Sequence, residues 1–155
     1  MSESLLHNRD LVCQQVVKQH RAGNRTIVAI AGPPAAGKST LAEVVVEALN
    51  DTRRAVVPHL DLPALKAAIL PMDGFHLDNC VLETRGLVQR KGAPQTFDAH
   101  GFCALVRRLR DQRATIVHPV FDRSRDMAVA GAGVIPDDVD IVIVEGNYLL
   151  LDADP

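Results

Sequence analysis

The chain has 155 residues, of which 47% are hydrophobic, and a formal net charge of −2 at pH 7. This length and composition predict one soluble domain, residues 1–155, with enough apolar mass for a core of its own. A net charge this close to zero gives no reason to expect a nucleic acid or an anionic membrane as a partner.

The N-terminal residues predict a helix and give a first indication of the compartment. Residues 1–23 have the spacing of an amphipathic helix that ends near Gly23, and they lack the continuous apolar stretch of a signal peptide. No later stretch is long and apolar enough to suggest a membrane span. Cys13, Cys80 and Cys103 form no CxxC pair, which favours reduced thiols. We therefore expect a cytoplasmic protein.

A complete phosphate-binding loop follows the first predicted strand. Residues 26–31 (TIVAIA) are apolar and β-branched, residues 32–40 (GPPAAGKST) fit the Walker A pattern GxxxxGKS/T, and residues 38–50 carry apolar side chains at helical spacing. This order predicts that backbone N–H groups and a helix N-terminus bind the phosphates of a nucleoside triphosphate. The alternative is a fortuitous loop between a strand and a helix. The predicted nucleotide-binding residues are Gly32, Ala35, Ala36, Gly37, Lys38, Ser39 and Thr40.

Individual positions in this loop predict different roles. Lys38 is expected to reach the β- and γ-phosphate oxygens, and the Ser39 hydroxyl is expected to bind Mg²⁺. Pro33 and Pro34 have no backbone N–H group, so they can only stiffen the entrance of the loop. The amides that follow them are left to bind the phosphates.

The middle of the chain alternates strands with helices. Residues 55–57 and 69–72 predict strands, and residues 61–68 (DLPALKAA) between them predict a short helix. Residues 73–98 are rich in glycine, proline and charge, so we expect a functional loop with one weak helical patch at residues 77–83.

The last third of the chain continues this alternation. Asp98 is the predicted cap of a helix with one apolar and one arginine-rich face. A short strand at residues 115–117 and an exposed arm at residues 122–132 precede a strongly apolar strand, residues 140–144. Strands that alternate with helices predict an α/β fold with a mainly parallel sheet, whose ligands gather at the carboxyl ends of the strands.

Two carboxylates stand at predicted strand ends, where they should meet the phosphate-binding loop. Glu145 follows the last apolar strand, a position from which a carboxylate can orient Mg²⁺ or its water shell. Asp73, in MDGFH, is the candidate general base for phosphoryl transfer to a hydroxyl group. Each has a plainer interpretation, Glu145 as a polar strand terminus and Asp73 as half of an Asp-Gly turn.

Two further segments carry basic side chains that could hold a substrate or a phosphate. They are RKGAPQTFD, residues 90–98, and FDRSRD, residues 121–126. Charged residues in such loops are more often simply solvated, and a lone histidine or aromatic side chain is more often part of the packing. The residues that we consider for an acceptor pocket are His76, Arg90, Lys91, Arg123, Arg125 and Tyr148.

Together these segments resemble the P-loop kinases that include uridine kinase, phosphoribulokinase and bacterial pantothenate kinase, and the similarity spans most of the chain. GPPAAGKST resembles their phosphate loop, MDGFH the strand end with the catalytic aspartate, and VEGNYLL the strand with the metal-linked glutamate. RKGAPQTFD is similar to a segment of pantothenate kinases, and PVFDRSRD to the substrate arm of the family. The likeness is greatest to a bacterial subgroup described as sugar-uptake-associated or uridine-kinase-like kinases.

The resemblance implies a fold, a reaction and a set of roles. The fold is the three-layer α/β/α arrangement of P-loop NTPases. The reaction is transfer of a phosphoryl group from ATP, with Mg²⁺, to a hydroxyl of a small metabolite such as a sugar, a nucleoside or a pantothenate-like compound. Asp73 and Lys38 would be catalytic, Ser39 and Glu145 would hold the metal, and the basic residues Arg90, Lys91, Arg123 and Arg125 would contact the substrate.

Two departures from the family pattern lead to an alternative function. Family members continue past the strand with the glutamate into a helix, an arginine-bearing lid and a final strand, whereas this chain ends at Pro155. The spacing before MDGFH is also longer than in the family. We therefore expect a C-terminally truncated domain, and the alternative is a module that binds ATP or ADP with little turnover. The expected partner is a small molecule, with a homodimer left open.

Overall fold

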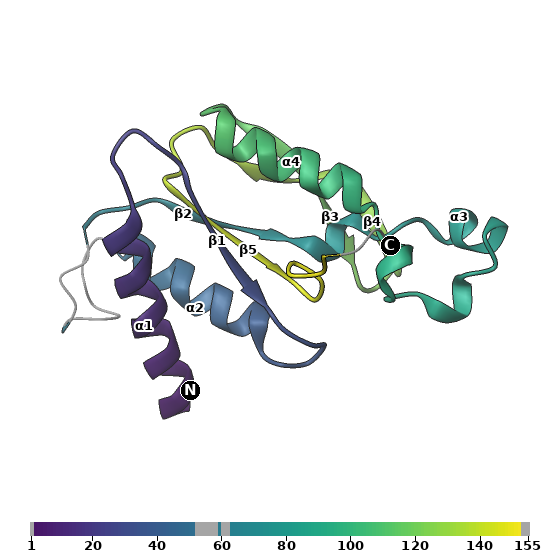
Figure 1. Cartoon of the computed structure of the whole chain (residues 1–155), viewed down its shortest axis with the longest axis horizontal. Helices are drawn as coiled ribbons and strands as arrows, with labels where there is room; N and C mark the ends of the chain where they lie inside the picture. The colour runs from purple at the N-terminus through teal and green to yellow at the C-terminus, as the bar shows by residue number, and fades with distance from the viewer. Residues whose placement is uncertain (1, 52–58, 60–62, 153–155) are drawn as a thin grey trace.

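The computed structural model describes residues 2–51, 59 and 63–152 of the chain. In Figure 1 these residues form three layers, with a parallel sheet between two helices on one face and one helix on the other. Several short helices lie beyond the sheet, on the side toward which its strands point (Figure 1), and a two-stranded hairpin runs alongside the sheet toward the same side. This is the α/β fold predicted from the sequence, and the three-layer arrangement is confirmed.

The central sheet brings three carboxyl strand ends to one edge. It has the order β1 (Thr26–Ala31), β5 (Ile141–Gly146), β2 (Ala67–Pro71), and both pairs are parallel. Glu145 of β5 pairs with Ile30 of β1 and with Pro71 of β2, so the three strands end nearly level. Residues that follow β1 and β2 in the sequence therefore meet beside the end of β5.

The three larger helices begin with different caps. In α1 (Glu3–Gln19) the Ser2 hydroxyl accepts a hydrogen bond from a backbone N–H, and in α4 (Ala99–Asp111) the Asp98 carboxylate accepts one from Gly101 at 2.8 Å. Helix α2 (Lys38–Asn50) has no side chain at this position, because its cap is Gly37 of the phosphate-binding loop. The predicted helix cap at Asp98 and the bounds of α2 are therefore correct.

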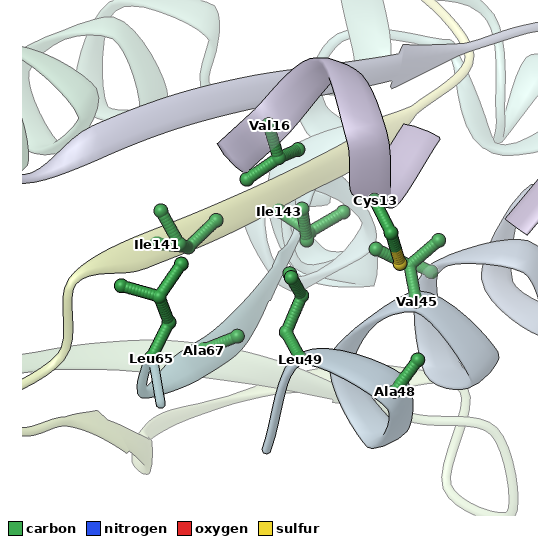
Figure 2. Packing of buried hydrophobic residues seen from close by; sticks show 10 residues of the cluster. Cys13, Val16, Val45, Ala48, Leu49, Leu65, Ala67, Ile141 and Ile143 are labelled. Carbon is green, nitrogen blue, oxygen red and sulfur yellow. The ribbon is translucent and has the colours of Figure 1, made fainter. Parts of the chain in front are cut away.

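Strand β5 supplies both hydrophobic cores, because alternate side chains point to opposite faces of a sheet. Ile141 and Ile143 pack toward α1 and α2 (Figure 2), and Val142 and Val144 pack in the cluster that includes α4. All four are buried, and each fully buried side chain of this size contributes about 1.5–3 kcal/mol. Figure 2 shows the first cluster, in which Cys13, Val16, Val45, Ala48, Leu49, Leu65 and Ala67 surround the two isoleucines.

The second sheet is a hairpin that stands next to the end of β2. Strands β3 (Ile116–Asp122) and β4 (Met127–Ile135) pair antiparallel, and the 3-10 helix η1 (Met72–Phe75) that follows β2 packs against β3. At the tip of the hairpin the Asp122 carboxylate accepts hydrogen bonds from the backbone of Ser124 and Arg125, which closes the turn.

The segment between η1 and α4 is folded into short helices. It contains α3 (Asn79–Thr84), η2 (Val88–Arg90) and η3 (Pro94–Thr96). Its path is fixed by an isolated bridge between His76 and Phe97 and by two hydrogen bonds of the buried Thr96 hydroxyl. The loop predicted for residues 73–98 is thus ordered by these helices and contacts.

Two parts of the predicted secondary structure are wrong. Residues 63–66 of the helix predicted over 61–68 are irregular, and its last two residues, Ala67 and Ala68, lie in β2, because pairing with β5 outweighs their helix propensity. The arm predicted over residues 122–132 is largely strand β4. The strand predicted for residues 55–57 lies outside the described residues.

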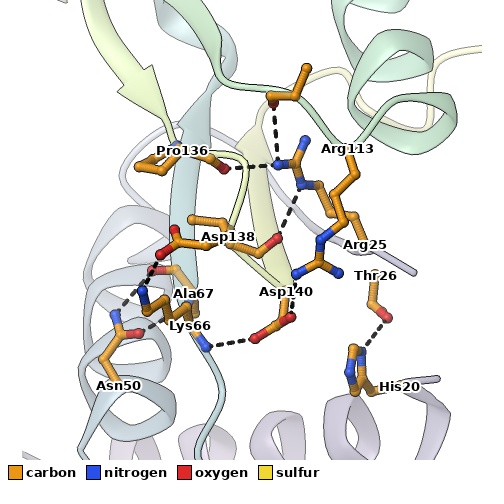
Figure 3. Close-up of polar contacts among 12 residues, drawn as sticks. His20, Arg25, Thr26, Asn50, Lys66, Ala67, Arg113, Pro136, Asp138 and Asp140 are labelled. Atoms are coloured by element: carbon orange, nitrogen blue, oxygen red, sulfur yellow. Dashed lines mark hydrogen bonds and ion pairs between the residues drawn. The ribbon is translucent and has the colours of Figure 1, made fainter. Parts of the chain in front are cut away.

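A polar network ties the loops at the opposite end of the sheet (Figure 3). The buried Arg25 guanidinium donates to four carbonyl oxygens, and Arg113 forms an ion pair with Asp140 at 2.7 Å. The carbonyls belong to the connections on either side of the hairpin, at Gln112, Ala114, Pro136 and Val139. This network orders the amino ends of the strands, away from the phosphate-binding loop.

Two simpler expectations also bear on the chain as a whole. All three cysteines are free, and burial raises the pKa of the Cys13 thiol to about 11, so this thiol is unreactive. Among the described residues, none of the helices combines the length and the apolar character that a membrane span requires.

Candidate active site

The phosphate-binding loop has the backbone conformation that leaves N–H groups free for an anion. Gly37 adopts a left-handed conformation with φ 80° and starts α2, and Ala35 also has a positive φ of 60°. No side chain caps this helix end within the described residues, and its first turn carries no acidic residue. The fit to a phosphate is therefore good, because uncapped N–H groups and the positive end of a helix favour an anion.

Lys38 is held close to the loop rather than extended into solvent. Its ammonium group donates to the Pro33 carbonyl oxygen at 2.8 Å, and its methylene groups pack near Gly32. The loop also lines an open cleft of about 420 Å³ against the start of α1, whose walls include Ser4, Asn8, Lys38 and Thr40. All seven predicted nucleotide-binding residues lie in this loop or in the first turn of α2.

Glu145 lies at the end of β5 beside this loop, as the sequence predicts. Its side chain is buried, and Oε2 accepts a hydrogen bond from the Ser39 hydroxyl at 3.2 Å. Burial raises the pKa of Glu145, and the negative charge of Asp73 raises it further, against the lowering effect of the Ser39 hydrogen bond and of Lys38. A hydroxyl and a carboxylate in contact can share a divalent cation with phosphate oxygens.

The Ser39 hydroxyl and the Glu145 carboxylate could form part of a metal site. Within the described residues, no group of three or more histidine, cysteine, aspartate or glutamate side chains could hold a metal ion. Mg²⁺ commonly binds through one or two protein oxygens plus phosphate oxygens and water. Ser39 and Glu145 would therefore suit it without further ligands from the protein.

Asp73 lies in η1, directly after β2, and reaches the same edge of the sheet. Its side chain is 29% exposed, and its carboxylate pairs with the Arg123 guanidinium at 3.3 Å. Gly74 follows it for a reason that the sequence does not reveal: its φ is not positive, but a Cβ at this position would clash with the backbone carbonyl of Pro119. Close contact with β3, rather than a tight turn, requires the glycine.

A cavity of about 410 Å³ lies next to Asp73 and contains two of the six residues considered for the acceptor. His76 donates from Nδ1 to the Asp73 carbonyl oxygen at 2.7 Å, and its ring is stacked near Phe97 and Phe121. Lys91 lies over the Phe121 ring, with Nζ 5.4 Å from the ring centroid. The cavity is lined by His76, Asn79, Val88, Lys91, Gly92, Phe121 and Asp126.

The other predicted substrate residues surround this cavity at greater distance. The Tyr148 hydroxyl donates to the Gly92 carbonyl oxygen at 2.7 Å and so positions one wall. Arg125 is exposed and pairs with Asp122 at 3.5 Å. Arg90 is exposed and, within the described part of the chain, makes no side-chain hydrogen bond or ion pair. The structure thus groups His76 and Lys91 in the cavity, Arg123 with Asp73, and Arg90 outside.

Five of the seven cavity residues were not predicted from the sequence, and three of them have polar or aromatic side chains. Phe121 and Asp126 belong to the hairpin, whose second strand was not predicted, and Asn79 begins α3, for which the sequence indicated only a weak helical patch. The sequence does contain a signal for Asp126. The segment FDRSRD, residues 121–126, has an aspartate that can start a turn, and Asp126 is the charged residue with which this segment ends. No local pattern indicates that Asn79 would meet it.

Individual known proteins match the chain, although no protein-family model does. The chain is 36% identical over 148 residues to YggC of Escherichia coli K12, described as an uncharacterized protein; the match covers 96% of this chain and 55% of YggC. It is 32% identical over 127 residues to a pantothenate kinase of Leifsonia xyli subsp. xyli, covering 82% of this chain and 37% of that kinase. The chain thus spans about half or less of the length of these relatives.

A solved structure has the same fold at higher identity. The crystal structure of a "putative fructose transport system kinase" from Silicibacter sp. TM1040 is 43% identical in sequence and superposes with a TM-score of 0.81. The match covers 94% of this chain and 66% of that protein. The phosphate-binding loop, Asp73 and Glu145 all lie within the part of this chain that the structure describes.

Proposed function

This chain is a homologue of the P-loop kinases, and from that premise we propose that it is an ATP-dependent phosphotransferase acting on a hydroxyl group of a small molecule. One observation carries the proposal: the free N–H groups of the α2 first turn, the Ser39–Glu145 pair and the Asp73 carboxylate meet at one edge of the sheet. Each alone has a structural explanation, but together they match the phosphate-binding, metal-binding and general-base groups that phosphoryl transfer uses.

The phosphate-binding loop would hold the triphosphate. The backbone N–H groups around Gly37 would bind the phosphate oxygens, and Lys38 would exchange the Pro33 carbonyl for the β- and γ-phosphates. This exchange is favourable because the ammonium group gains an anionic acceptor in place of a neutral carbonyl oxygen. When bound between Ser39 and Glu145, Mg²⁺ would neutralise part of the phosphate charge.

Asp73 would remove the proton of the acceptor. As the acceptor oxygen forms its bond to the γ-phosphorus, the bond from that phosphorus to the β,γ-bridging oxygen breaks, ADP leaves with the bond electrons, and the hydroxyl proton passes to the Asp73 carboxylate. Arg123 orients that carboxylate through the 3.3 Å ion pair. His76 fixes the η1 backbone from the cavity side.

The test is acceptor-dependent release of ADP from Mg·ATP by this chain, over a panel of sugars, nucleosides and pantothenate. A parallel titration measures ATP binding directly. We expect at least one acceptor to stimulate ADP release, and the Lys38→Ala variant to lose both binding and release. ATP binding without any acceptor-stimulated turnover would instead favour a module that binds the nucleotide with little turnover. Absence of ATP binding would overturn both the phosphotransferase and the binding module.

A further inference from the structure

Lys91 lines the cavity near Asp73 and has no hydrogen-bond donor left for a ligand. A lysine ammonium has three donors. Lys91 uses them for Asn79 Oδ1 at 2.7 Å, the Asp126 carbonyl oxygen at 2.6 Å and Asp126 Oδ2 at 2.8 Å. Its side chain is only 15% exposed, so these partners compete with little solvent. Lys91 is thus positioned by the protein rather than left free for an anion.

The neighbouring cations are also compensated by carboxylates. Arg123 pairs with Asp73 and Arg125 pairs with Asp122. An acceptor with a carboxylate or a phosphate group would therefore meet the Asp126 carboxylate in the cavity, while Lys91, Arg123 and Arg125 are already paired. The repulsion between like charges makes such an acceptor unfavourable.

The polar atoms that remain in the cavity are mainly hydrogen-bond acceptors. The Asp126 carboxylate has about four lone-pair positions, of which Lys91 and Asn79 occupy two. Because His76 Nδ1 donates to the Asp73 carbonyl oxygen, Nε2 is the ring nitrogen that remains for a ligand. A complementary ligand must supply donors, and hydroxyl groups are donors without charge.

The hairpin turn is built to place this carboxylate. The Asp122 side chain fixes the backbone of the turn, and Asp126 at its end adopts a positive φ of 52°. Aspartate tolerates this conformation better than most residues, although not without cost. The backbone at Asp126 is therefore strained in the conformation that brings its carboxylate to Lys91. Such strain favours a functional role for the Lys91–Asp126 pair.

We propose that the acceptor is an uncharged polyhydroxylated molecule, a sugar or polyol, whose hydroxyl groups donate to Asp126 and His76. The proposal rests on the kinase function proposed above and defines its substrate class. One further hydroxyl points to Asp73, loses its proton to that carboxylate and forms the new bond to the γ-phosphorus, while the bond to ADP breaks. The ring of Phe121 offers the C–H groups of the ligand an apolar wall.

The experiment compares acceptors that differ in charge but little in shape. The pairs are D-fructose with D-fructose 6-phosphate, D-ribose with D-ribose 5-phosphate, and pantothenol with pantothenate. We measure kcat/KM for ADP release, and separately the affinity for each compound without ATP by calorimetry. In the pair that binds, the neutral member should be favoured about tenfold or more. An anionic member that binds or reacts as well as its neutral counterpart overturns the proposal.

The two measurements separate this proposal from the kinase function. Binding of a neutral member without turnover supports the assigned ligand class and counts against the kinase function. Turnover with an anionic member that is as efficient as turnover with its neutral counterpart supports the kinase and overturns the ligand class. Failure of every neutral compound of the panel to bind or react overturns the proposed class.

A variant tests the residue that carries the inference. Asp126→Asn keeps the shape of the side chain, and asparagine tolerates a positive φ, but Lys91 loses its compensating charge. We expect the preference for the neutral member of a pair to fall about tenfold. Asp111→Asn is the matched control, because it removes an exposed carboxylate paired with Arg110 on α4 and should leave the preference unchanged. An unchanged preference in Asp126→Asn overturns the role of the pair.

Discussion

The two carboxylates at the edge of the sheet have environments that suit different tasks. Asp73 is 29% exposed and pairs with an arginine, whereas Glu145 is buried, accepts from the Ser39 hydroxyl and has a raised pKa. Carboxyl groups in one site whose surroundings differ in this way commonly divide the roles of a reaction. The accessible carboxylate suits proton transfer with an acceptor, and the buried one suits a metal ion.

Replacement of Asp73 by asparagine tests the first role. Asp73→Asn should lower phosphoryl transfer by roughly 10² or more, the usual scale for a general base, while ATP affinity stays within about twofold. Steady-state kinetics with the best acceptor and an ATP titration measure the two quantities. Asp111→Asn, remote from the site, should change neither. Turnover that survives in Asp73→Asn would exclude Asp73 as the base.

Replacement of Glu145 by glutamine tests the second role through the pH dependence of stability. The native pKa of Glu145 is raised above its ordinary value of 4.5, mainly by burial, so its ionisation destabilises the fold as pH rises through the native pKa. Glu145→Gln should therefore unfold at higher urea concentration than the wild type at pH 7, and the difference should vanish below pH 4.5. A variant less stable at pH 7 would contradict this.

The same variant should also respond differently to metal. Because glutamine is a weaker metal ligand than glutamate, the Mg²⁺ concentration that gives half-maximal turnover should be at least about tenfold higher in Glu145→Gln than in the wild type. An unchanged Mg²⁺ requirement would separate Glu145 from the metal while leaving the stability result intact. The two readouts together therefore distinguish a buried structural carboxylate from a metal-linked one.

At the scale of elements, Arg25 joins the connections on both sides of the hairpin to the start of β1 (Figure 3). Arg25→Met would leave four carbonyl groups without this donor, and we expect the free energy of unfolding to fall by ~3 kcal/mol. Arg113→Met is the control, since its partly exposed pair with Asp140 should contribute within about 1 kcal/mol. If urea unfolding gave equal losses of unfolding free energy in the two variants, the buried hydrogen bonds of Arg25 would stabilise the fold no more than the partly exposed ion pair of Arg113.

The predictable elements are those whose pattern is local. Strand β1 and helix α2 match their predicted bounds, because an apolar run, a glycine loop and helical spacing are all read within a few residues. The start of β2 was predicted as helix, since its sequence favours helix and only pairing with β5 overrides it. Strand β4 was missed because MAVAGAGVI is small and glycine-rich, with little alternation to indicate a strand.

The candidate site divides in the same way. The positions of the loop, Asp73 and Glu145 were found because each stands at or just after the end of a strand, and parallel strand ends converge. The Lys91–Asp126 pair was not found, because its members lie 35 residues apart and only the hairpin brings them together. The reason for Gly74 was also hidden, as the clashing carbonyl belongs to β3. The roles of Lys38, Asp73 and Glu145 in catalysis stay predictions.

At the scale of the whole molecule, the two ends of the sheet differ in how far their polar groups are already hydrogen-bonded. The carboxyl ends carry free N–H groups and carboxylates beside open cavities, and the amino ends carry the saturated Arg25 network (Figure 3). Unsatisfied or charged groups at a site reduce stability, whereas satisfied buried bonds add to it. Substitutions near Arg25 should thus act on folding, and substitutions near Lys38 on binding.

Ligand binding should therefore stabilise the molecule measurably, whether or not turnover occurs. At an ATP concentration of a hundred times Kd, the free energy of unfolding should rise by about 2.7 kcal/mol. For a chain of this size that corresponds to roughly 5–10 °C in melting temperature. Lys38→Ala should lose most of this shift at the same ATP concentration in a thermal unfolding assay. A shift of full size in the variant would contradict the role of the lysine.

Strand β5 lies between two others with all six residues buried, so its backbone is bonded on both sides. Its amide protons should exchange with deuterium only when the whole domain opens. Asp73 and Arg123 instead belong to a four-residue helix and to a hairpin turn. Glu145 is thus a fixed reference point, and any adjustment that aligns an acceptor falls to the side of the site that holds Asp73.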